Sequence, residues 1–295
     1  MKQITVISGK GGTGKTVLTA SFAALAKKAC FVDCDVDAAN LHLVLNPKIL
    51  ESREFTGGKK AVIDTDKCNQ CGKCVEVCRF NAISSPNSDG KGSGDFRVDQ
   101  ISCEGCTVCS LVCPVDAIRM EEKLSGKWFI SDTKYGPFVH ARLEIAQENS
   151  GKLVARIREI AREIAQRENL DYVIIDGPPG IGCPVIASLS GVDLALVVAE
   201  PTLSGIHDMA RIMDVASHFN IPVKVIINKH DINVQNSRSI EKFCREREIS
   251  VLGHIPFSEK VVESVRRGIP VVESGNDKAV KEIVAIWDKV VVDVI

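Results

Sequence analysis

The stretch that decides the fold is ITVISGKGGTGKT, at residues 4–16. Its first four residues are all β-branched and form the short apolar run typical of a buried strand. The glycine-rich part fits the pattern G-x-x-x-x-G-K-[ST], and Leu18, Phe22 and Leu25 then recur at helical spacing. A strand, a glycine-rich loop and a helix in this order predict a phosphate-binding loop.

The composition of this loop suits a triphosphate. Glycines let the backbone aim several N–H groups at one anion, and the helix N-terminus adds partial positive charge. Lys15 is expected to reach the β- and γ-phosphates and the Thr16 hydroxyl to ligate Mg²⁺. The residues predicted to hold the nucleotide here are Gly9, Gly11, Gly12, Thr13, Gly14, Lys15 and Thr16. The alternative, a glycine-rich turn with a solvated lysine, is disfavoured by the strand and helix on either side.

Four further apolar runs predict more strands of the same sheet. They end near residues 33, 176, 198 and 227 and do not alternate with polar residues, which is typical of strands covered on both faces. Helical patterns separate them, for instance over residues 153–164. The fold class predicted is α/β, with a doubly wound and mostly parallel sheet joined by right-handed crossovers.

The overall composition narrows the partners. The chain has 295 residues, 45% of them hydrophobic, and a net charge of -1, as in soluble globular proteins. This balance provides no global field for nucleic acid, so no nucleic acid partner is expected. The N-terminal residues lead straight into a strand pattern without a signal-peptide core, which predicts a cytoplasmic protein. Residues 280–294 have apolar side chains on one helix face and balanced charges, so we expect a core-packing helix and no stable membrane anchor.

Cysteines mark a second domain. Eight of the 12 cysteines fall within residues 61–121, which predicts an insert of ferredoxin-like α+β type between two parts of the α/β domain, 1–60 and 122–295. The insert contains an internal repeat, because its first four cysteines recur 35 residues later. The repeated positions are Cys68, Cys71, Cys74 and Cys78, followed by Cys103, Cys106, Cys109 and Cys113.

The spacing C-x₂-C-x₂-C-x₃-C, present twice, is that of bacterial two-cluster ferredoxins, in which the fourth cysteine ligates the other cluster. It predicts two [4Fe-4S] clusters with crossed ligands. Cluster 1 takes Cys68, Cys71, Cys74 and Cys113, and cluster 2 takes Cys103, Cys106, Cys109 and Cys78. Structural zinc is the alternative, but zinc sites usually pair two short C-x₂-C units.

Ser8–Thr16 also carries a lysine, Lys10, that the general pattern does not require. With it, the loop resembles the deviant Walker A motif of MinD/ParA/Mrp ATPases, a group that includes the nitrogenase iron protein. The resemblance spans nearly the whole chain, and with the insert it points to MinD-superfamily ATPases that contain a ferredoxin domain. It implies a nucleotide-dependent homodimer in which Lys10 acts on the phosphates bound by the other subunit.

Other strand ends extend the resemblance. Asp35 resembles the carboxylate of the family's first switch, and Asp176-Gly177 its Walker B and second switch. With Lys10 and Lys15, both aspartates are the expected catalytic residues, and Gly177 is expected to offer an N–H to the γ-phosphate. Asn228 and Asp231 follow the fifth strand, where relatives bind the base, and Pro256 lies in a loop resembling their adenine-side loop. ATP is favoured, although N-K-x-D also occurs in GTPases.

The resemblance leaves the role open between three classes. The first is ATP hydrolysis coupled to electron transfer with an unidentified redox or iron-sulfur protein. The second is an iron-sulfur cluster carrier, although the C-P-x-C pair of Mrp-type carriers is missing. The third is a positioning ATPase with redox-sensing clusters. Cys183 occupies the spacing of one ligand of the iron protein's bridging cluster, but no cysteine lies between Pro114 and Gly182 to act as the second.

Overall fold

The computed structural model describes residues 1–85, 95–144 and 150–294, without the side chains of residues 293 and 294. The chain divides into two compact units. The first contains residues 1–53, 128–142 and 150–295, and the second contains residues 54–127 and 143–149. The insert expected at 61–121 falls inside the second unit, whose bounds lie several residues further out on both sides.

Among the described residues, nine strands form one sheet in the order β11-β10-β9-β1-β8-β2-β7-β6-β3. The pairs from β11 to β7 are parallel, and β1 lies at the centre between β8 and β9. This confirms the predicted mostly parallel α/β fold. Its parallel strands are β1 (Lys2–Ser8), β2 (Ala29–Asp33), β7 (Gly136–Leu143), β8 (Tyr172–Pro179), β9 (Leu194–Ala199), β10 (Val223–Asn228) and β11 (Val251–Ile255).

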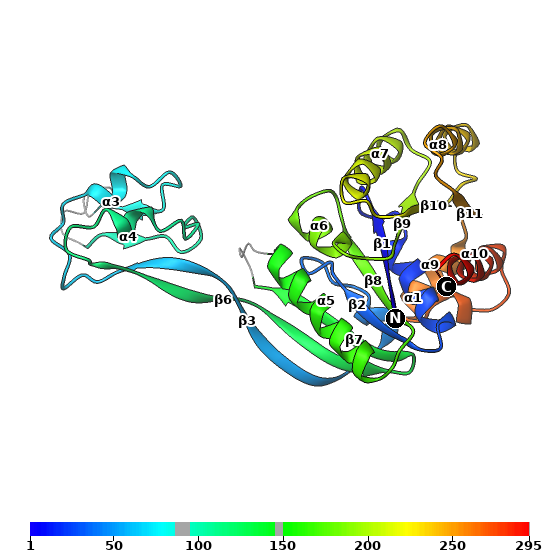
Figure 1. Ribbon diagram of the computed structural model, residues 1–295, viewed down its shortest axis with the longest axis horizontal. Helices are drawn as coiled ribbons and strands as arrows, with labels where there is room; N and C mark the ends of the chain where they lie inside the picture. The colour runs from blue at the N-terminus through cyan, green and yellow to red at the C-terminus, as the bar shows by residue number, and fades with distance from the viewer. Residues whose placement is uncertain (86–94, 145–149, 295) are drawn as a thin grey trace. The chain divides into compact units, whose positions relative to one another are not determined.

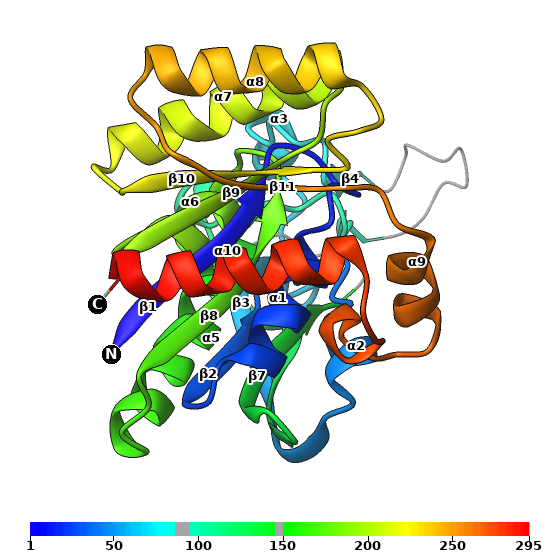
Figure 2. The same ribbon diagram turned by 90° about the vertical axis from the view of Figure 1, so that its right-hand side faces the viewer.

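Helices of the first unit cover both faces of its strands, and this explains the continuous apolar runs. Helices α5–α8 lie on one face, and α1 and α10 lie on the other (Figures 1 and 2). The long helices are α1 (Lys15–Leu25), α5 (Ser150–Arg167), α7 (Leu203–His218), α8 (Val234–Glu246) and α10 (Lys278–Val294). The short ones are α2 (His42–Leu45), α6 (Cys183–Leu189), α9 (Glu259–Arg266) and the 3₁₀ turn η1 (Val271–Glu273).

The C-terminal helix α10 packs into the core. Val280, Ile283, Trp287 and Val290 are buried, and the Trp287 ring lies 5.1 Å from that of Phe22 on α1. No helix in the described part of the chain is long and apolar enough to cross a membrane.

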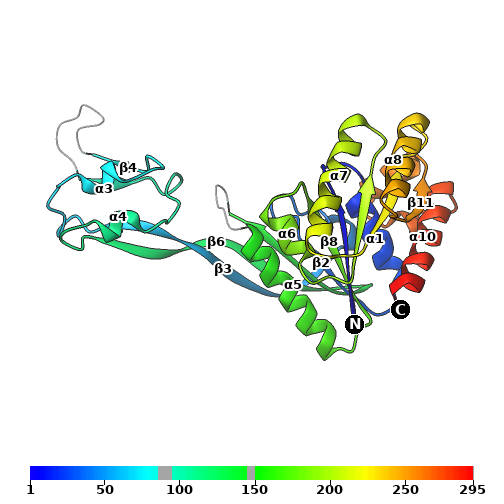
Figure 3. The ribbon, with the colours of Figure 1, turned by 45° about the horizontal axis from the view of Figure 1, so that its top comes forward.

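Besides β11, three strands near the other edge of the sheet were not predicted from the sequence. β7 follows β6 (Ile118–Thr133) after a two-residue turn, and β6 lies beside β3 (Lys48–Ile63) at the edge of the sheet (Figure 3). β3 and β6 are each 16 residues long, and their residues belong partly to the first unit and partly to the second. Many of their side chains are exposed and polar, so they lack the apolar runs by which the other strands were recognised.

The second unit repeats its backbone as well as its cysteines. Its short elements are α3 (Lys73–Glu76), β4 (Ile83–Ser84), β5 (Arg97–Val98) and α4 (Val108–Leu111). Asp64 N–H donates to Ala117 O and Asp99 N–H donates to Ala82 O, both at 2.7 Å, so each half bonds to the other in the same way. Positive backbone φ angles also recur 35 residues apart, at Gly72 and Thr107. The two halves therefore share one local fold.

A buried histidine on β7 makes the first unit sensitive to acid. His140 stacks on Phe129 and Phe138 at 4.8 and 4.7 Å, next to His42. Burial, with a smaller effect of His42, lowers the pKa of His140 from 6.5 to about 4. The unfolded chain therefore binds a proton between pH 6.5 and 4 that the folded chain does not. Stability from this residue is present above pH 6.5 and falls as pH drops toward 4.

We expect His140→Phe to remove this acid sensitivity. At pH 4.5 the histidine costs on the order of 2 kcal/mol of folding free energy relative to pH 7. Between pH 7 and pH 4.5 the free energy of unfolding of the variant should therefore fall by about 2 kcal/mol less than that of wild type. Urea unfolding at both pH values measures the difference. His218→Phe, at an exposed position on α7, is the control and should behave as wild type. Parallel stability losses in His140→Phe and wild type would contradict the assignment.

Candidate functional sites

The phosphate loop lies between β1 and α1, as its sequence predicts. Gly9–Gly14 form the loop, and α1 begins at Lys15 with no described side chain capping its first N–H groups. Gly14 has φ of 98°, and a Cβ there would lie 2.3 Å from Asn228 Nδ2, so only glycine fits. The Thr13 hydroxyl is buried without a hydrogen-bond partner among the described residues. An anion at these free N–H and O–H groups would satisfy them, which is the geometry that a phosphate requires.

At the predicted magnesium end of the site, Thr16 contacts Asp176. The Thr16 hydroxyl donates to Asp176 Oδ2 at 2.7 Å, and the Thr19 hydroxyl donates to Oδ1 at 3.2 Å. Burial raises the pKa of Asp176 to about 6, and the bonds from both threonines and the charge of Lys15 oppose that rise. A hydroxyl and a carboxylate in contact at the end of a parallel strand are hard oxygen donors suited to Mg²⁺ or its bound water.

Two aspartates after β2 have different surroundings. Asp35 is half-buried, and burial raises its pKa while Lys15 lowers it, which places this predicted catalytic carboxylate near the phosphate-loop lysine. Asp33 is fully buried and accepts hydrogen bonds from the N–H groups of Asp35, Asn40 and Leu41 at 3.0–3.1 Å. It thereby fixes the loop that carries Asp35, a positioning role that the sequence analysis missed.

Gly177 lies inside β8. A Cβ at this residue would approach Ile7 Cγ2 to 2.4 Å, so glycine is needed for the close packing of β8 on β1. Its expected N–H bond to the γ-phosphate stays a prediction.

Lys10 is held by the loop between β9 and α7. Its ammonium lies 3.2 Å from Glu200 Oε2 and donates to Thr202 Oγ1 at 2.9 Å. Glu200 also binds Lys229 Nζ at 2.9 Å. Burial raises the pKa of Glu200, but the bonds from Lys229 and Lys10 outweigh burial and lower it below its usual value. Glu200, which the sequence analysis did not select, thus holds Lys10 within its own chain.

An apolar cavity of about 290 Å³ lies beside the phosphate loop. Its walls include Val17 on α1, Val261 and Val265 on α9, and the predicted base-binding residue Asn228. The Asn228 amide donates to Thr13 O at 2.7 Å, which ties the end of β10 to the phosphate loop. Valine side chains against a glycine-rich loop suit the flat face of a nucleobase.

The other two predicted base-binding residues are placed differently. Asp231 accepts the Phe257 N–H at 2.7 Å, so its carboxylate is already engaged in holding the loop after β11. Pro256 is the first residue of that loop and does not line the cavity, whereas the preceding Ile255 does. An engaged Asp231 favours adenine over guanine, because the guanine interpretation requires this carboxylate to bind the base.

The cysteine unit brings together the residues predicted for cluster 1. Cys68, Cys71, Cys74 and Cys113 line one small cavity, and the first three come from the first motif while Cys113 comes from the second. Cys78 and Cys113 accept N–H bonds from Ala82 and Ala117 at 3.3 and 3.2 Å, again 35 residues apart. Four cysteines that line one cavity and come from both motifs have the residue types of an iron-sulfur cluster's ligands.

For cluster 2, the predicted ligands Cys103 and Cys109 are buried, whereas Cys106 is exposed. Both buried residues pack in one apolar cluster with Phe96 and Ile118, and Cys78 lies against it. In the described part of the chain, no three His, Cys, Asp or Glu side chains are placed to hold a single metal ion.

Cys183 is exposed at the start of α6, on the chain that follows Asp176. One close neighbour is Gly151 on α5, where a Cβ would lie 3.1 Å from Cys183 Cβ. A bridging cluster would need a second thiolate from each chain, and the sequence has no cysteine between Pro114 and Gly182 to supply it.

Comparisons with known proteins cover nearly the whole chain. A family model described as the CobQ/CobB/MinD/ParA nucleotide binding domain matches residues 4–271. The uncharacterized protein MJ0578 of Methanocaldococcus jannaschii is 34% identical over 291 residues, 97% of this chain and 95% of that protein. The septum site-determining protein MinD of Thermotoga maritima is 25% identical, over 94% of this chain and 83% of that protein.

A solved structure shows the likeness of fold. The MinD protein of Pyrococcus horikoshii, complexed with Mg-ADP, has a TM-score of 0.58 and 16% identity, and the match covers 98% of this chain and 95% of that one.

Proposed function

Because the chain belongs to the CobQ/CobB/MinD/ParA nucleotide-binding family, we propose that it is a dimeric ATPase that carries two [4Fe-4S] clusters. We further propose that its nucleotide state is coupled to electron transfer with a partner protein. The observation that carries the proposal is the presence in one chain of a phosphate loop joined to Asp176 and a crossed set of cysteines around one cavity.

ATP hydrolysis rests on the arrangement of the first unit. The free N–H groups at the start of α1 and the Thr13 hydroxyl would hold the phosphates, and the valine-lined cavity would take adenine. Thr16 and Asp176 would hold Mg²⁺, while Lys15 neutralises the charge that develops on the γ-phosphate. Asp35 would orient the attacking water, and the Asp33 bonds keep its loop in place.

In the proposed dimer, Lys10 would have a second role. Glu200 and Thr202 hold its ammonium in the single chain. Release of Lys10 from Glu200 on dimer closure would free a cation for the phosphates of the other subunit, and Lys229 would remain to neutralise Glu200. The lysine would then join the site only when two subunits meet, which makes hydrolysis depend on dimerisation.

The cysteine unit supports the redox part. Cys68, Cys71, Cys74 and Cys113 would hold one cluster, and Cys103, Cys106, Cys109 and Cys78 the other. When bound, such clusters supply one-electron transfer. The N–H bonds from Ala82 and Ala117 orient the sulfurs of Cys78 and Cys113. The chain runs from Asp35 through α2 into β3, so the first switch is linked in sequence to the strand that enters the second unit.

Anaerobic purification followed by electron paramagnetic resonance tests this function. We expect about eight irons per chain and a reduced spectrum that changes when a non-hydrolysable ATP analogue is added with Mg²⁺. Cluster potential depends on the charge and hydrogen bonds around the sulfurs, so a nucleotide-driven rearrangement should alter the signal. The control is a non-hydrolysable GTP analogue at the same concentration, which should change the spectrum less.

Other outcomes separate the alternatives. Iron-poor material would contradict the cluster assignment. A spectrum unchanged by nucleotide would contradict coupling. Transfer of a labile cluster to an acceptor protein would then favour the carrier class. Stimulation of hydrolysis by membranes or DNA would favour the positioning class.

A further inference from the structure

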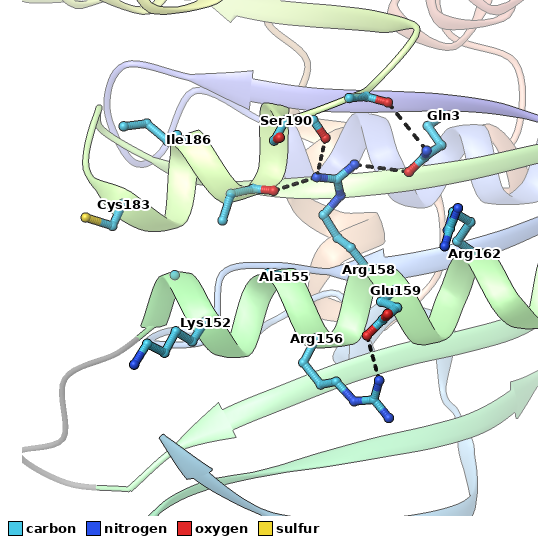
Figure 4. A pocket seen from close by; sticks show the side chains of 13 residues that line it. Gln3, Lys152, Ala155, Arg156, Arg158, Glu159, Arg162, Cys183, Ile186 and Ser190 are labelled. Carbon is cyan, nitrogen blue, oxygen red and sulfur yellow. Dashed lines mark hydrogen bonds and ion pairs between the residues drawn. The ribbon is translucent and has the colours of Figure 1, made fainter. Parts of the chain in front are cut away.

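A wide groove of about 970 Å³ is lined by α5 and α6 of the first unit, which pack against each other (Figure 4). One wall is α5, with Lys152, Arg156 and Arg162, and the opposite wall is α6, with Cys183 and Ile186. It contains none of the residues placed in the nucleotide site. α6 begins four residues after β8, the strand of Asp176, so an occupant of the groove would contact the helix next to the second switch.

The groove has an excess of positive charge. Lys152, Arg156 and Arg162 are exposed along α5, and Glu159 is the one acidic residue among the described residues that line the groove. Glu159 Oε2 lies 2.6 Å from Arg156 Nη1, so this carboxylate offsets the charge of Arg156 alone. The net charge of the chain is only -1, so this local excess departs from its overall balance.

A fourth cation forms the floor. Arg158 is 9% exposed, and its Nη1 donates to the backbone oxygens of Ala187 and Ser190 at 2.5 and 2.8 Å (Figure 4). Nη2 donates to Gln3 Oε1 at 3.0 Å, and the buried Nε has no partner among the described residues. All its partners are neutral. A buried guanidinium that forms no ion pair with a carboxylate within the described ranges leaves a positive potential under the groove.

We propose that this groove docks an acidic segment of a partner protein. The exposed cations extend from residue 152 to residue 162, about 15 Å along the helix, and do not converge on one point. The groove also has apolar lining: Ala155 lies on α5 with the cations, and Ile186 and Ala187 lie on α6. A phosphate group needs donors that converge on one anion. An extended segment with alternating carboxylates and small apolar side chains instead matches both the charge and the apolar surface.

Fluorescence anisotropy with a labelled Glu-Ala repeat peptide tests the proposal. A peptide of about eight residues spans roughly 26 Å when extended, enough to cover the row of cations. It should bind the intact protein, weaken as salt is raised, and bind about tenfold less tightly to the double variant Arg156→Glu, Arg162→Glu. The matched control is Arg167→Glu, Arg245→Glu, which reverses two exposed cations outside the groove and should bind as wild type.

Competition experiments identify the ligand class. A Lys-Ala peptide of the same length should not bind. Equal peptide affinity in the two double variants would overturn the proposal, as would displacement of the peptide by equimolar pyrophosphate or tighter binding of single-stranded DNA than of peptide. ATP turnover of the groove variant should match that of the control variant, since neither pair touches the nucleotide site.

Discussion

Replacing Lys15 with alanine is expected to lower ATP affinity about a hundredfold or more, a loss of about 3 kcal/mol. Lys15 is only 6% exposed, and its charge lowers the pKa of both Asp35 and Asp176 against the effect of burial. Without it, the half-buried Asp35, the buried Asp176 and the phosphates would share one site with no fixed cation but Mg²⁺. Isothermal titration calorimetry with Mg-ATP measures the loss, and thermal unfolding verifies that the variant is folded.

Lys10→Ala is the matched control, because it removes a lysine of the same loop. Lys10 contacts Glu200 and Thr202 in the single chain, so its removal should leave ATP binding within about threefold of wild type. Hydrolysis should fall at protein concentrations where the wild type dimerises. Wild-type ATP affinity in Lys15→Ala would contradict the assigned site, and equal turnover in wild type and Lys10→Ala would remove the role of Lys10 across the dimer.

The parts of the fold that the sequence predicted are those with a strong local pattern. β1, β2, β8, β9 and β10 are buried on both faces, and burial requires apolar residues throughout. β3 and β6 could not be recognised in this way. Both carry many exposed polar residues, and their pairing joins segments far apart in the chain. Such pairing depends on long-range contacts, which single-sequence patterns do not record.

The same distinction holds for the sites. The phosphate-loop pattern selected Thr16, the family resemblance selected Asp176, and the ferredoxin spacing grouped Cys113 with the first-motif cysteines. In the structure Thr16 donates to Asp176, and those four cysteines line one cavity. The sequence patterns did not predict Glu200 or Arg158. Neither residue belongs to a recognisable sequence motif. Each contacts a residue more than a hundred positions away in the chain: Glu200 contacts Lys10, and Arg158 contacts Gln3.

From the cysteine assignment we expect that removing any one ligand abolishes one whole cluster. Cys68→Ser and Cys113→Ser should each reduce the iron content of anaerobic protein from about eight to about four per chain. The reason is that both thiols face the same cavity although they come from different motifs. Cys244→Ser is the control, because Cys244 is buried on α8, where burial raises the pKa of its thiol to about 11, and it should retain all the iron.

Double variants decide whether the ligands cross. If Cys113 belongs with Cys68, the double variant Cys68→Ser, Cys113→Ser removes two ligands of one cluster and should still retain about four irons. Cys68→Ser, Cys78→Ser would instead damage both clusters and leave almost none. Ligands confined to their own motifs predict the reverse, because Cys68 and Cys78 would then serve one cluster. Iron and sulfide analysis of the two double variants therefore separates crossed ligands from ligands confined to one motif. The variant that retains about four irons under one arrangement loses almost all its iron under the other.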